Sequence, residues 1–451
     1  MSSGSQRHTD DTGCLTVAGG QIGGDLYFPG DKSISHRVAM LAAIASGTST
    51  IRGYSEGEDC LATLAALNCF GVEYAWNRDI LSITGNGLDG LREPAGAIHC
   101  GNSGTTMRLL CGLLAAQEFS STLIGDKSLS GRPMERVAVP LRQMGAEITT
   151  SNGCPPLRID GNPGLGAGRI EIEVASAQVK TAVILAALYA DGESSITAPG
   201  LLRDHSERML PLFDCPVQIE GPTTLVSGPA KLQPVEFTVP GDFSAAAFFM
   251  VAACLAGKGV TRLMDVGLNP GRTALISLLQ NMGARIEVAQ HPVGDAEPIG
   301  EIHIWPSALT GIEVPAELVV PAIDEFPALC IAAACAQGET TIRGAAELRI
   351  KESDRIEAMA VALRSLGVFV ETRPDGMNIR GGEINGGRVA CAGDHRIAMA
   401  LSILGLVAKG PLTVTGTECI QTSFPGFRNL LVQAGANIAA NSEKGTPYGD
   451  Q

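Results

Sequence analysis

A structural pattern recurs six times along the 451-residue chain. Each copy begins with a polar stretch and continues with an Ala-rich helical segment, a Gly-containing turn and a strand rich in Thr, Ser and Ile. A second, amphipathic helical segment and a further strand complete the copy. The starts are 70, 75, 65, 82 and 71 residues apart, and the copies begin near Asp31, Gly101, Ser176, Gly241, Ile323 and Asp394. A repeat of this length that alternates helices and strands predicts six similar α/β units over nearly the whole chain.

The first helical segment of each copy is apolar almost all round, whereas the second has one charged face. In the fourth copy, the apolar run Ala245 to Ala256 includes 12 residues. A helix that is apolar all round must be buried, and six such helices are too many for one core of ordinary domain size. We therefore expect two α/β domains of three units each, with the active site in the cleft between them. The predicted domains are residues 30–240 and residues 241–451 together with 1–29, whose strand-like LTVAGG and DLYFPG should join the second domain.

Composition narrows the classes of function. With 33 Lys and Arg against 47 Asp and Glu, the formal net charge is −14, so the chain has no general basic field for nucleic acid. An apolar run of 12 residues is too short to cross a membrane. The polar amino terminus lacks a targeting pattern, and the 12 cysteines form no C-x-x-C pair. We expect a cytoplasmic protein with reduced, packed thiols.

Lysine and arginine residues lie at the openings of the apolar helices, for example in GDKSISHR, GNSGTTMR and GDHR. A helix N-terminus carries unpaired N–H groups and a partial positive charge, which favour anions and disfavour cations. Capping by Asp31, Asn102, Ser176 and Asp394 explains one polar residue per opening, but it does not explain the cations. We therefore expect a small ligand with several negative charges, such as phosphate and carboxylate. The candidate cations, each also compatible with an ordinary surface charge, are Lys32, Arg37, Arg108, Arg132, Lys180, Arg203, Arg349, Lys351, Arg355 and Arg396.

Two carboxylates, Asp324 and Glu352, lie near these cations in the sequence. They are candidates for general acid and base, and the alternative is that they only form ion pairs with Lys351 and Arg355. A dinucleotide-binding site is not predicted. GNGLDG has the spacing of a dinucleotide-binding loop, but no helical pattern follows it. The seven histidines show no metal-ligand spacing, so we expect no bound metal.

The sequence motifs at the helix openings resemble those of a known family. PGDKSISHR, GNSGTTMR, SLSGRPM, SAQVK, RDHSE, IDEFP, RIKESDR and GDHRIAM, in this order between about residues 15 and 438, are similar to the motifs of the 5-enolpyruvylshikimate-3-phosphate synthases. The resemblance implies two similar domains, each with three βαβαββ repeats around buried parallel helices in a pseudo-threefold arrangement. It implies a cofactor-free transferase of the shikimate pathway, which leads to chorismate and aromatic amino acids. The enolpyruvyl group of phosphoenolpyruvate would pass to the 5-hydroxyl of shikimate 3-phosphate, and phosphate would leave from a tetrahedral intermediate. A monomer inhibited by glyphosate is the family expectation.

The resemblance also assigns residues, motif by motif. Those implied for shikimate 3-phosphate are Lys32, Ser33, Arg37, Ser176, Ala177, Gln178, Arg203, Asp324 and Lys351. Those implied for phosphoenolpyruvate are Lys32, Asn102, Gly104, Thr105, Arg108, Arg132, Gln178, Arg355 and Arg396. In catalysis, Asp324 would be the base on the attacking hydroxyl and Glu352 the proton donor to the methylene carbon, with Lys32, Lys351 and His395 beside them.

Two features depart from the family pattern. Thr422 stands where many members have a lysine that contacts phosphoenolpyruvate. SAQVK and RDHSE resemble a glyphosate-tolerant subclass, but Gly104 is kept where one tolerant form has alanine.

The nearest alternative function is that of a UDP-N-acetylglucosamine enolpyruvyl transferase, which would place a cysteine in the segment Lys127 to Met134, where this chain has none. A non-catalytic repeat scaffold that binds an anionic metabolite is the alternative from another class.

Overall fold

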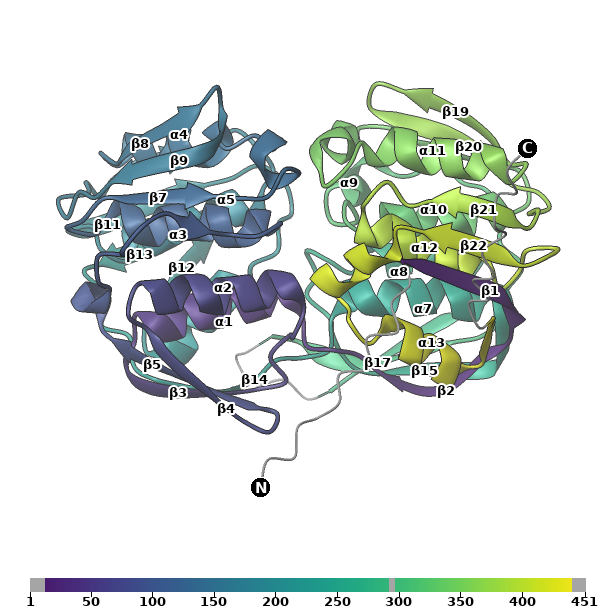
Figure 1. Cartoon of the computed structure of the whole chain (residues 1–451), viewed down its shortest axis with the longest axis horizontal. Helices are drawn as coiled ribbons and strands as arrows, with labels where there is room; N and C mark the ends of the chain where they lie inside the picture. Colours follow the sequence, from purple (N-terminus) through teal and green to yellow (C-terminus); the bar gives the residue numbers. More distant parts are fainter. Residues whose placement is uncertain (1–12, 292–296, 440–451) are drawn as a thin grey trace, which may run out of the picture.

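A computed structural model describes residues 13–291 and 297–439. The chain forms two α/β halves that lie side by side (Figure 1). Six long helices are buried over most of their surface, and all six begin one to three residues after a predicted opening: α1 (Lys32–Ala43), α3 (Gly104–Ala115), α5 (Ala177–Ala187), α7 (Phe243–Ala256), α10 (Phe326–Cys335) and α12 (His395–Leu404). Each copy also has a second helix: α2 (Glu58–Cys69), α4 (Glu135–Gln143), α6 (His205–Met209), α8 (Ala274–Asn281), α11 (Arg355–Ser365) and α13 (Phe427–Ala434). The predicted α/β class and helix pattern are confirmed.

The strands form six small sheets within the described residues. The first half has three: β14 (Glu236–Thr238), β3 (Ser46–Arg52), β5 (Ile80–Asn86) and β4 (Glu73–Asn77); β6 (Ile98–His99), β7 (Ser121–Ile124), β9 (Cys154–Asp160) and β8 (Glu147–Ser151); β10 (Arg169–Glu171), β11 (Gly192–Thr197), β13 (Thr223–Gly228) and β12 (Gln218–Glu220). The second half has β16 (Ile286–Gln290), β17 (Ile299–Ile304), β15 (Gly257–Gly267) and β2 (Ile22–Tyr27); β18 (Glu339–Ile342), β20 (Gly376–Arg380) and β19 (Phe369–Arg373); β21 (Gly387–Ala390), β22 (Leu412–Thr415), β1 (Cys14–Gly20) and β23 (Ala436–Ile438).

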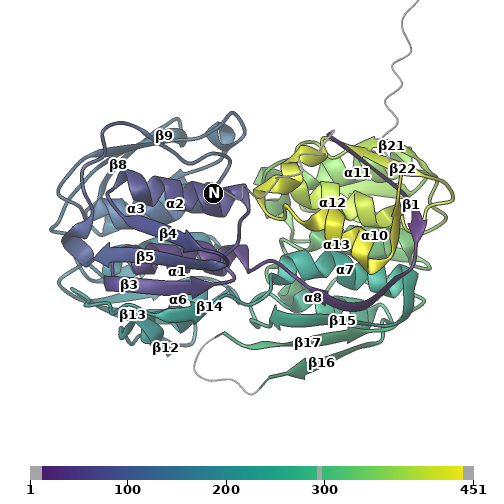
Figure 2. The ribbon, with the colours of Figure 1, turned by 60° about the horizontal axis from the view of Figure 1, so that its bottom comes forward.

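The sheets share one plan and cover the helices from outside. Five of them combine one parallel strand pair with antiparallel pairs. In the sheet of β18, two isolated parallel bridges, Thr310 with Gln337 and Glu313 with Thr341, stand where a fourth strand would lie. Figure 2 shows β15, β17 and β16 outside α7 and α8. The repeated plan leaves the helix N-termini as the places where polar side chains can gather.

Buried apolar side chains form two separate clusters. One draws on residues 34–239, and the other draws on residues 15–26 and 243–436. The amino-terminal strands belong to the second cluster because β1 pairs with β22 and β23, and β2 pairs with β15. The polypeptide therefore passes twice between two separately packed cores.

The two crossings lie against each other. The Asp31 N–H donates to the Pro240 carbonyl at 2.8 Å, and the Asp242 N–H donates to the Pro29 carbonyl at 2.9 Å. A Cβ at Gly30 would lie 1.8 Å from the Gly53 carbonyl oxygen, so this close approach of backbones needs a glycine. The crossings form a compact link rather than a loose linker.

One second helix differs from the sequence expectation. The third copy, HSERMLPLFDCPVQI, has the apolar spacing of one amphipathic helix, but α6 ends at Met209 and a 3₁₀ turn, η3 (Leu210–Phe213), follows. Pro211 lacks an N–H group and cannot sit in a helix interior without losing a hydrogen bond. A helix that continued past Met209 would have Pro211 in its interior, and the structure has the 3₁₀ turn there instead.

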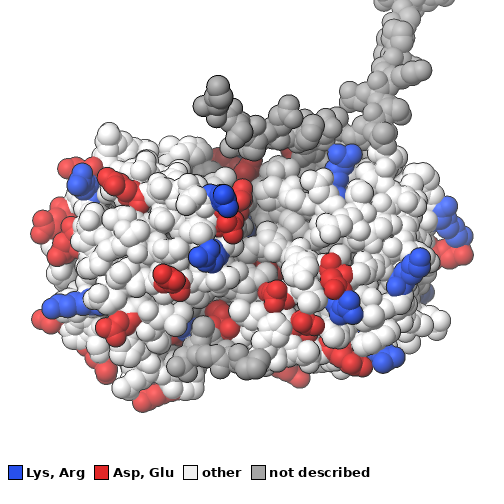
Figure 3. All heavy atoms as spheres, turned by 90° about the horizontal axis from the view of Figure 1, so that it is seen from below, with Lys and Arg blue, Asp and Glu red and all other residues white. Residues whose placement is uncertain are grey.

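Acidic and basic side chains are interspersed on the face shown in Figure 3. Within the part of the chain that the structure describes, no helix is long and apolar enough to cross a membrane. The described residues also contain no group of three or more His, Cys, Asp or Glu placed to hold a metal ion.

Candidate active site between the two halves

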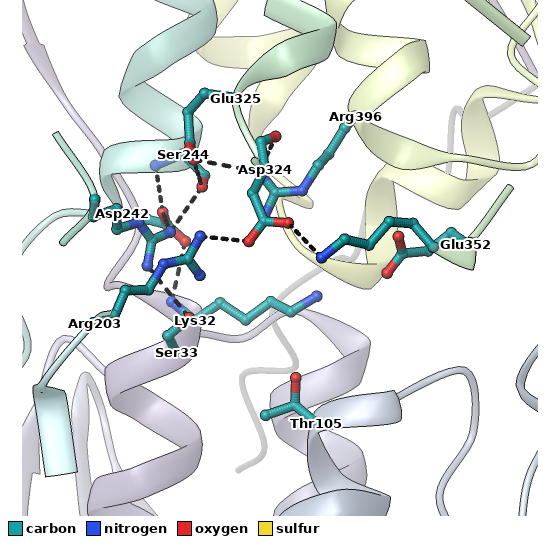
Figure 4. Close-up of polar contacts among 12 residues, drawn as sticks. Lys32, Ser33, Thr105, Arg203, Asp242, Ser244, Asp324, Glu325, Glu352 and Arg396 are labelled. Atoms are coloured by element: carbon teal, nitrogen blue, oxygen red, sulfur yellow. Dashed lines mark hydrogen bonds and ion pairs between the residues drawn. The ribbon is translucent and has the colours of Figure 1, made fainter. Parts of the chain in front are cut away.

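The helix openings of both halves line one cleft. From the first half, the predicted site residues that line it are Lys32, Ser33, Gly104, Thr105, Arg108, Arg132, Ser176, Ala177, Gln178 and Arg203. From the second half they are Asp324, Lys351, Glu352, His395 and Arg396. Residues that are more than 300 positions apart in the sequence therefore line the same cleft. Figure 4 shows Lys32 and Thr105 on one side of it, and Asp324, Glu352 and Arg396 on the other.

Three predicted site residues lie behind this lining. Arg37 is 3% exposed and donates to the Ser33 carbonyl at 2.8 Å and to Thr181 Oγ1 at 3.1 Å. Asn102 accepts a hydrogen bond of 2.6 Å from Arg132 Nη2. Arg355 is 1% exposed. All three contact a lining residue or its backbone, so they support the cleft wall.

Two of the candidate cations lie elsewhere. Lys180 Nζ pairs with Glu207 at 2.7 Å, and Arg349 pairs with Asp354 at 2.6 Å; neither lines the cleft. The expectation that they belong to the anion-binding cluster is wrong. Their carboxylate partners neutralise them locally, and sequence position alone did not reveal those partners.

The capping prediction needs one correction. Asp31, Ser176 and Asp394 accept hydrogen bonds from the first turns of their helices, as expected. At α3, the cap is Ser103 rather than Asn102, because the Ser103 hydroxyl accepts the Thr106 N–H at 3.1 Å. Ser103 directly precedes the helix, whereas Asn102 is one residue too early to reach that N–H.

Asp324 is surrounded by cations from both halves. Its carboxylate lies 2.5 Å from Arg203 Nη2, 3.4 Å from Lys351 Nζ and 3.6 Å from Arg355 Nη1. Burial alone would raise the pKa of Asp324, but the charges of Lys351, Arg203 and Arg396 outweigh burial and hold that pKa well below its usual range. The carboxylate is therefore ionised at neutral pH.

Glu352 has a similar setting on the same side of the cleft as Asp324. Its carboxylate lies 2.5 Å from Arg355 Nη2 and 3.5 Å from Arg132 Nη1. Burial opposes ionisation, but Arg355 and Arg132 hold the pKa of Glu352 well below its usual range. Both carboxylates thus form the ion pairs that the sequence left open as an alternative.

The first half contributes a connected set of polar side chains. Gln178 accepts a hydrogen bond of 2.7 Å from Arg108 Nη1 and donates one of 2.9 Å to Thr105 Oγ1. Burial and the nearby charges of Arg136 and Arg132 lower the pKa of Arg108 to about 10. Crowding of cations in a buried place is unfavourable by itself, and an anionic ligand would relieve it.

His395 enters the cleft from the N-terminus of α12. Burial, followed by the charges of Lys32 and Arg396, holds the pKa of His395 well below its usual value. Its imidazole is therefore neutral at neutral pH and can donate or accept a hydrogen bond without adding charge.

Thr422 does not take the place of the family lysine. It ends a 3₁₀ segment, η5 (Thr417–Thr422), and its hydroxyl donates to the Cys419 carbonyl at 2.8 Å. Thr422 is not among the residues that line the cleft.

The sequence analysis missed several polar residues of the cleft. Asp59 forms an ion pair with Lys32, and Arg136 pairs with Glu347 across the cleft at 2.8 Å. Asp59 stands in the first turn of α2, where an acidic residue also suits the helix dipole, so its sequence setting gave no separate signal. In the sequence, Arg136 and Glu347 lie close to the motifs SLSGRPM and RIKESDR. This proximity could have identified them as candidates.

The fold of two three-repeat halves also occurs in a solved structure of low sequence identity. The structure of the enolpyruvyl transferase NikO from Streptomyces tendae matches with a TM-score of 0.76 at 20% identity, covering 94% of this chain and 98% of that chain. At that identity the match concerns the fold alone. It shows that the two three-repeat halves of this chain adopt the fold of that protein.

Closer relatives identify the family. The family model of EPSP synthase (3-phosphoshikimate 1-carboxyvinyltransferase) matches residues 17–431. A protein of that name from Pelobacter propionicus is 50% identical over 416 residues, which cover 92% of this chain and 96% of the relative. The structure of EPSP synthase from Acinetobacter baumannii matches with a TM-score of 0.83 at 46% identity, covering 95% of this chain and 100% of that chain. The chain belongs to the EPSP synthase family, as its motifs predicted.

Proposed function

We propose that the cleft between the halves transfers the enolpyruvyl group of phosphoenolpyruvate to the 5-hydroxyl of shikimate 3-phosphate. The observation that carries the proposal is the convergence of cations from both halves on two ion-paired carboxylates. Both substrates are multiply anionic, and Arg and Lys supply the charge-assisted hydrogen bonds that such ligands need. The reaction belongs to the shikimate pathway.

The first half is the proposed site for shikimate 3-phosphate. Ser33, Ser176, Ala177 and Gln178 stand at the N-termini of α1 and α5, where hydroxyl and N–H groups suit a phosphate. Arg203 and Lys32 supply charge beside them. Arg37 acts from behind, through its hydrogen bonds to the Ser33 and Ala177 carbonyls.

Phosphoenolpyruvate is proposed to lie against α3 and the second half. Gly104 and Thr105 open α3, and Arg108 and Arg132 flank them. Arg396 and the buried Arg355 face them from the second half, and Asn102 holds Arg132 in place. These contacts would hold the phosphate as negative charge develops on it.

Asp324 and Glu352 are the proposed proton carriers. Asp324 takes the proton of the acceptor hydroxyl as its oxygen attacks C2 of phosphoenolpyruvate, and Glu352 gives a proton to C3. The C3 proton then returns to the protein while the bond from C2 to the phosphate oxygen breaks. An anionic substrate that pairs with Arg355 and Arg132 weakens their hold on Glu352, which raises its pKa and lets it carry a proton. Addition and elimination leave the overall oxidation state unchanged, so we expect no cofactor.

Further properties extend the same proposal. We infer a cytoplasmic monomer that glyphosate inhibits at the phosphoenolpyruvate position. We also infer that residues 30–240, and residues 241–451 with 1–29, are domains that move relative to each other about the crossings.

A phosphate-release assay tests the proposed reaction. The purified protein with phosphoenolpyruvate should release phosphate when shikimate 3-phosphate is present, and not with shikimate or UDP-N-acetylglucosamine. Release with the UDP-sugar in place of shikimate 3-phosphate would support the alternative transferase. Binding of both substrates without release would support a non-catalytic scaffold.

A further inference from the structure

Arg136 and Glu347 join the two halves at the edge of the cleft. Arg136 lies in the first turn of α4, and Glu347 lies in the 3₁₀ segment η4 (Ala346–Ile350), which precedes α11. The contact is bidentate, with Arg136 Nη1 2.8 Å from Oε2 and Nη2 3.3 Å from Oε1. The guanidinium side chain is 17% exposed and the carboxylate side chain 42% exposed. This geometry holds two planar groups in one orientation.

The pair lies far from the places where the chain crosses between the halves. Figure 1 shows the crossings near β14 and β17, at the bottom of the view, whereas α4 and α11 lie at the top. A contact at the end remote from a hinge is the most sensitive to opening, because a small rotation there separates the partners most. The pair can therefore form in the closed cleft and not in an opened one.

Two other ion pairs that join the halves across the cleft involve proposed substrate ligands. Arg132 pairs with Glu352 at 3.5 Å, and Arg203 pairs with Asp324 at 2.5 Å. These cations must turn at least partly to the substrates when the substrates bind. Arg136 and Glu347 carry no such role in the proposed mechanism, so their pair can persist with the cleft occupied.

We propose that Arg136 and Glu347 form a clasp that stabilises the closed cleft, which makes both of them positioning residues for the two substrates. The inference rests on the proposed function, since the substrates are the ligands that need the closed state. An interaction present only in the closed state raises the closed population and the apparent affinity of any ligand that binds it. Saturating substrates drive closure by themselves, so the clasp should change KM much more than kcat.

Arg136 and Glu347 could instead affect substrate binding only through the electrostatic field of their charges. That alternative predicts different effects of the two substitutions, so the test can distinguish it from the clasp. Arg136 lies close enough to the site for its charge to lower the pKa of Arg108, after burial, and Glu347 contributes the opposite charge. If only the field mattered, removing the arginine would weaken anion binding and removing the carboxylate would strengthen it. If the clasp matters, both changes weaken binding.

The test compares Arg136→Gln, Glu347→Gln and the double variant in the full chain. We expect each single variant to raise KM for phosphoenolpyruvate and shikimate 3-phosphate by about twofold to fivefold, the scale of a good ion pair. The double variant should match the singles, because each residue acts through the other, and kcat should stay within about twofold. The clasp is overturned if Glu347→Gln lowers KM, if the double variant returns to the wild-type KM, or if neither single variant changes KM.

Arg158→Gln is the matched control. Arg158 also makes a bidentate contact, to Asp160 at 2.7 and 3.1 Å, but this pair lies within one half. We expect its KM values to equal those of the wild type; a rise like that of the clasp variants would overturn the proposal by showing that any lost ion pair has this effect. Thermal melting of every variant confirms that the compared proteins are folded. Absence of turnover in the wild type would instead refute the proposed function, so the two failures are distinguishable.

Discussion

Oδ2 of Asp324 lies 2.5 Å from Nη2 of Arg203, although the two residues belong to different halves of the chain. The proposed base of the second half is thus held by a cation of the first half. Shikimate 3-phosphate, which we place beside Arg203, would take over part of that cation's charge. Binding of the acceptor and release of the base are therefore coupled through one guanidinium group.

Replacing Asp324 should separate chemistry from binding. We expect Asp324→Asn to lower kcat by about 100-fold or more, because an amide cannot accept the hydroxyl proton. Shikimate 3-phosphate should still bind within a few-fold of the wild-type affinity, as measured by calorimetry. Near-normal kcat with early melting would show that Asp324 serves only as an ion-pair partner. Asp160→Asn, in an exposed pair, is the control for loss of a carboxylate elsewhere.

The depressed pKa values of Asp324 and Glu352 predict how stability depends on pH. A carboxylate whose pKa is lower in the folded state than in the unfolded chain stabilises the fold above its unfolded pKa of about 4. That contribution is lost as the pH falls from about 5 toward the lower folded pKa values. In urea unfolding between pH 6 and pH 3.5, the double variant Asp324→Asn, Glu352→Gln should lose less stability with falling pH than the wild type. Equal slopes for the two proteins would contradict this assignment.

The link between the halves should depend on Arg272. This side chain is 2% exposed and pairs with Asp31 at 2.9 Å and with Asp242 at 2.8 Å, one at each crossing. Burial alone would lower the pKa of Arg272, but the two carboxylates raise it. Arg272→Met strands two buried carboxylates and should cost about 3 to 5 kcal/mol of unfolding free energy.

Chemical denaturation measures that cost, and Arg262→Met is the matched control. Arg262 pairs with Asp25 at 2.5 Å, but both side chains are more than 40% exposed, so its loss should cost less than about 1 kcal/mol. A similar small loss in Arg272→Met would show that the crossings do not depend on this network.

Gly104 should control inhibition by glyphosate. A Cβ built there would lie 3.0 Å from Arg108 Nη1 and 3.3 Å from Arg132 Nη1, so a methyl group would press on the cations proposed to hold phosphoenolpyruvate. We expect Gly104→Ala to weaken inhibition by about 10-fold to 100-fold, the scale of one badly fitted methyl group in a tight pocket. Inhibition curves at fixed phosphoenolpyruvate measure the change. Equal sensitivity of the two proteins to glyphosate would show that other residues, those of the tolerant-type motifs SAQVK and RDHSE, control the inhibition.

The sequence predicted the buried helices more completely than the contacts of the site residues. The buried helices were predictable because an all-round apolar segment has one stable location. The early end of α6 was not predictable from Pro211 alone, because α4 keeps Pro140 in its interior. Partners such as Asp59 for Lys32, or Glu347 for Arg136, were not predictable. These contacts depend on how distant repeats pack, and a carboxylate in a first helical turn looks the same whether it meets a cation or solvent. For the same reason, Lys180 and Arg349 could not be separated from the cleft cations.

Deuterium exchange into phosphoenolpyruvate tests the proton chemistry most directly. Addition makes C3 a methyl group, and reversal returns one of its protons to the protein, so wild-type protein with both substrates in D₂O should place deuterium in the methylene group. We propose Glu352 as the carrier of that proton, on the evidence of its position beside Arg355 and Arg132. Mass spectrometry of recovered phosphoenolpyruvate should therefore show deuterium with the wild type and at least about 100-fold slower exchange with Glu352→Gln. Exchange by Glu352→Gln at the wild-type rate would contradict the account.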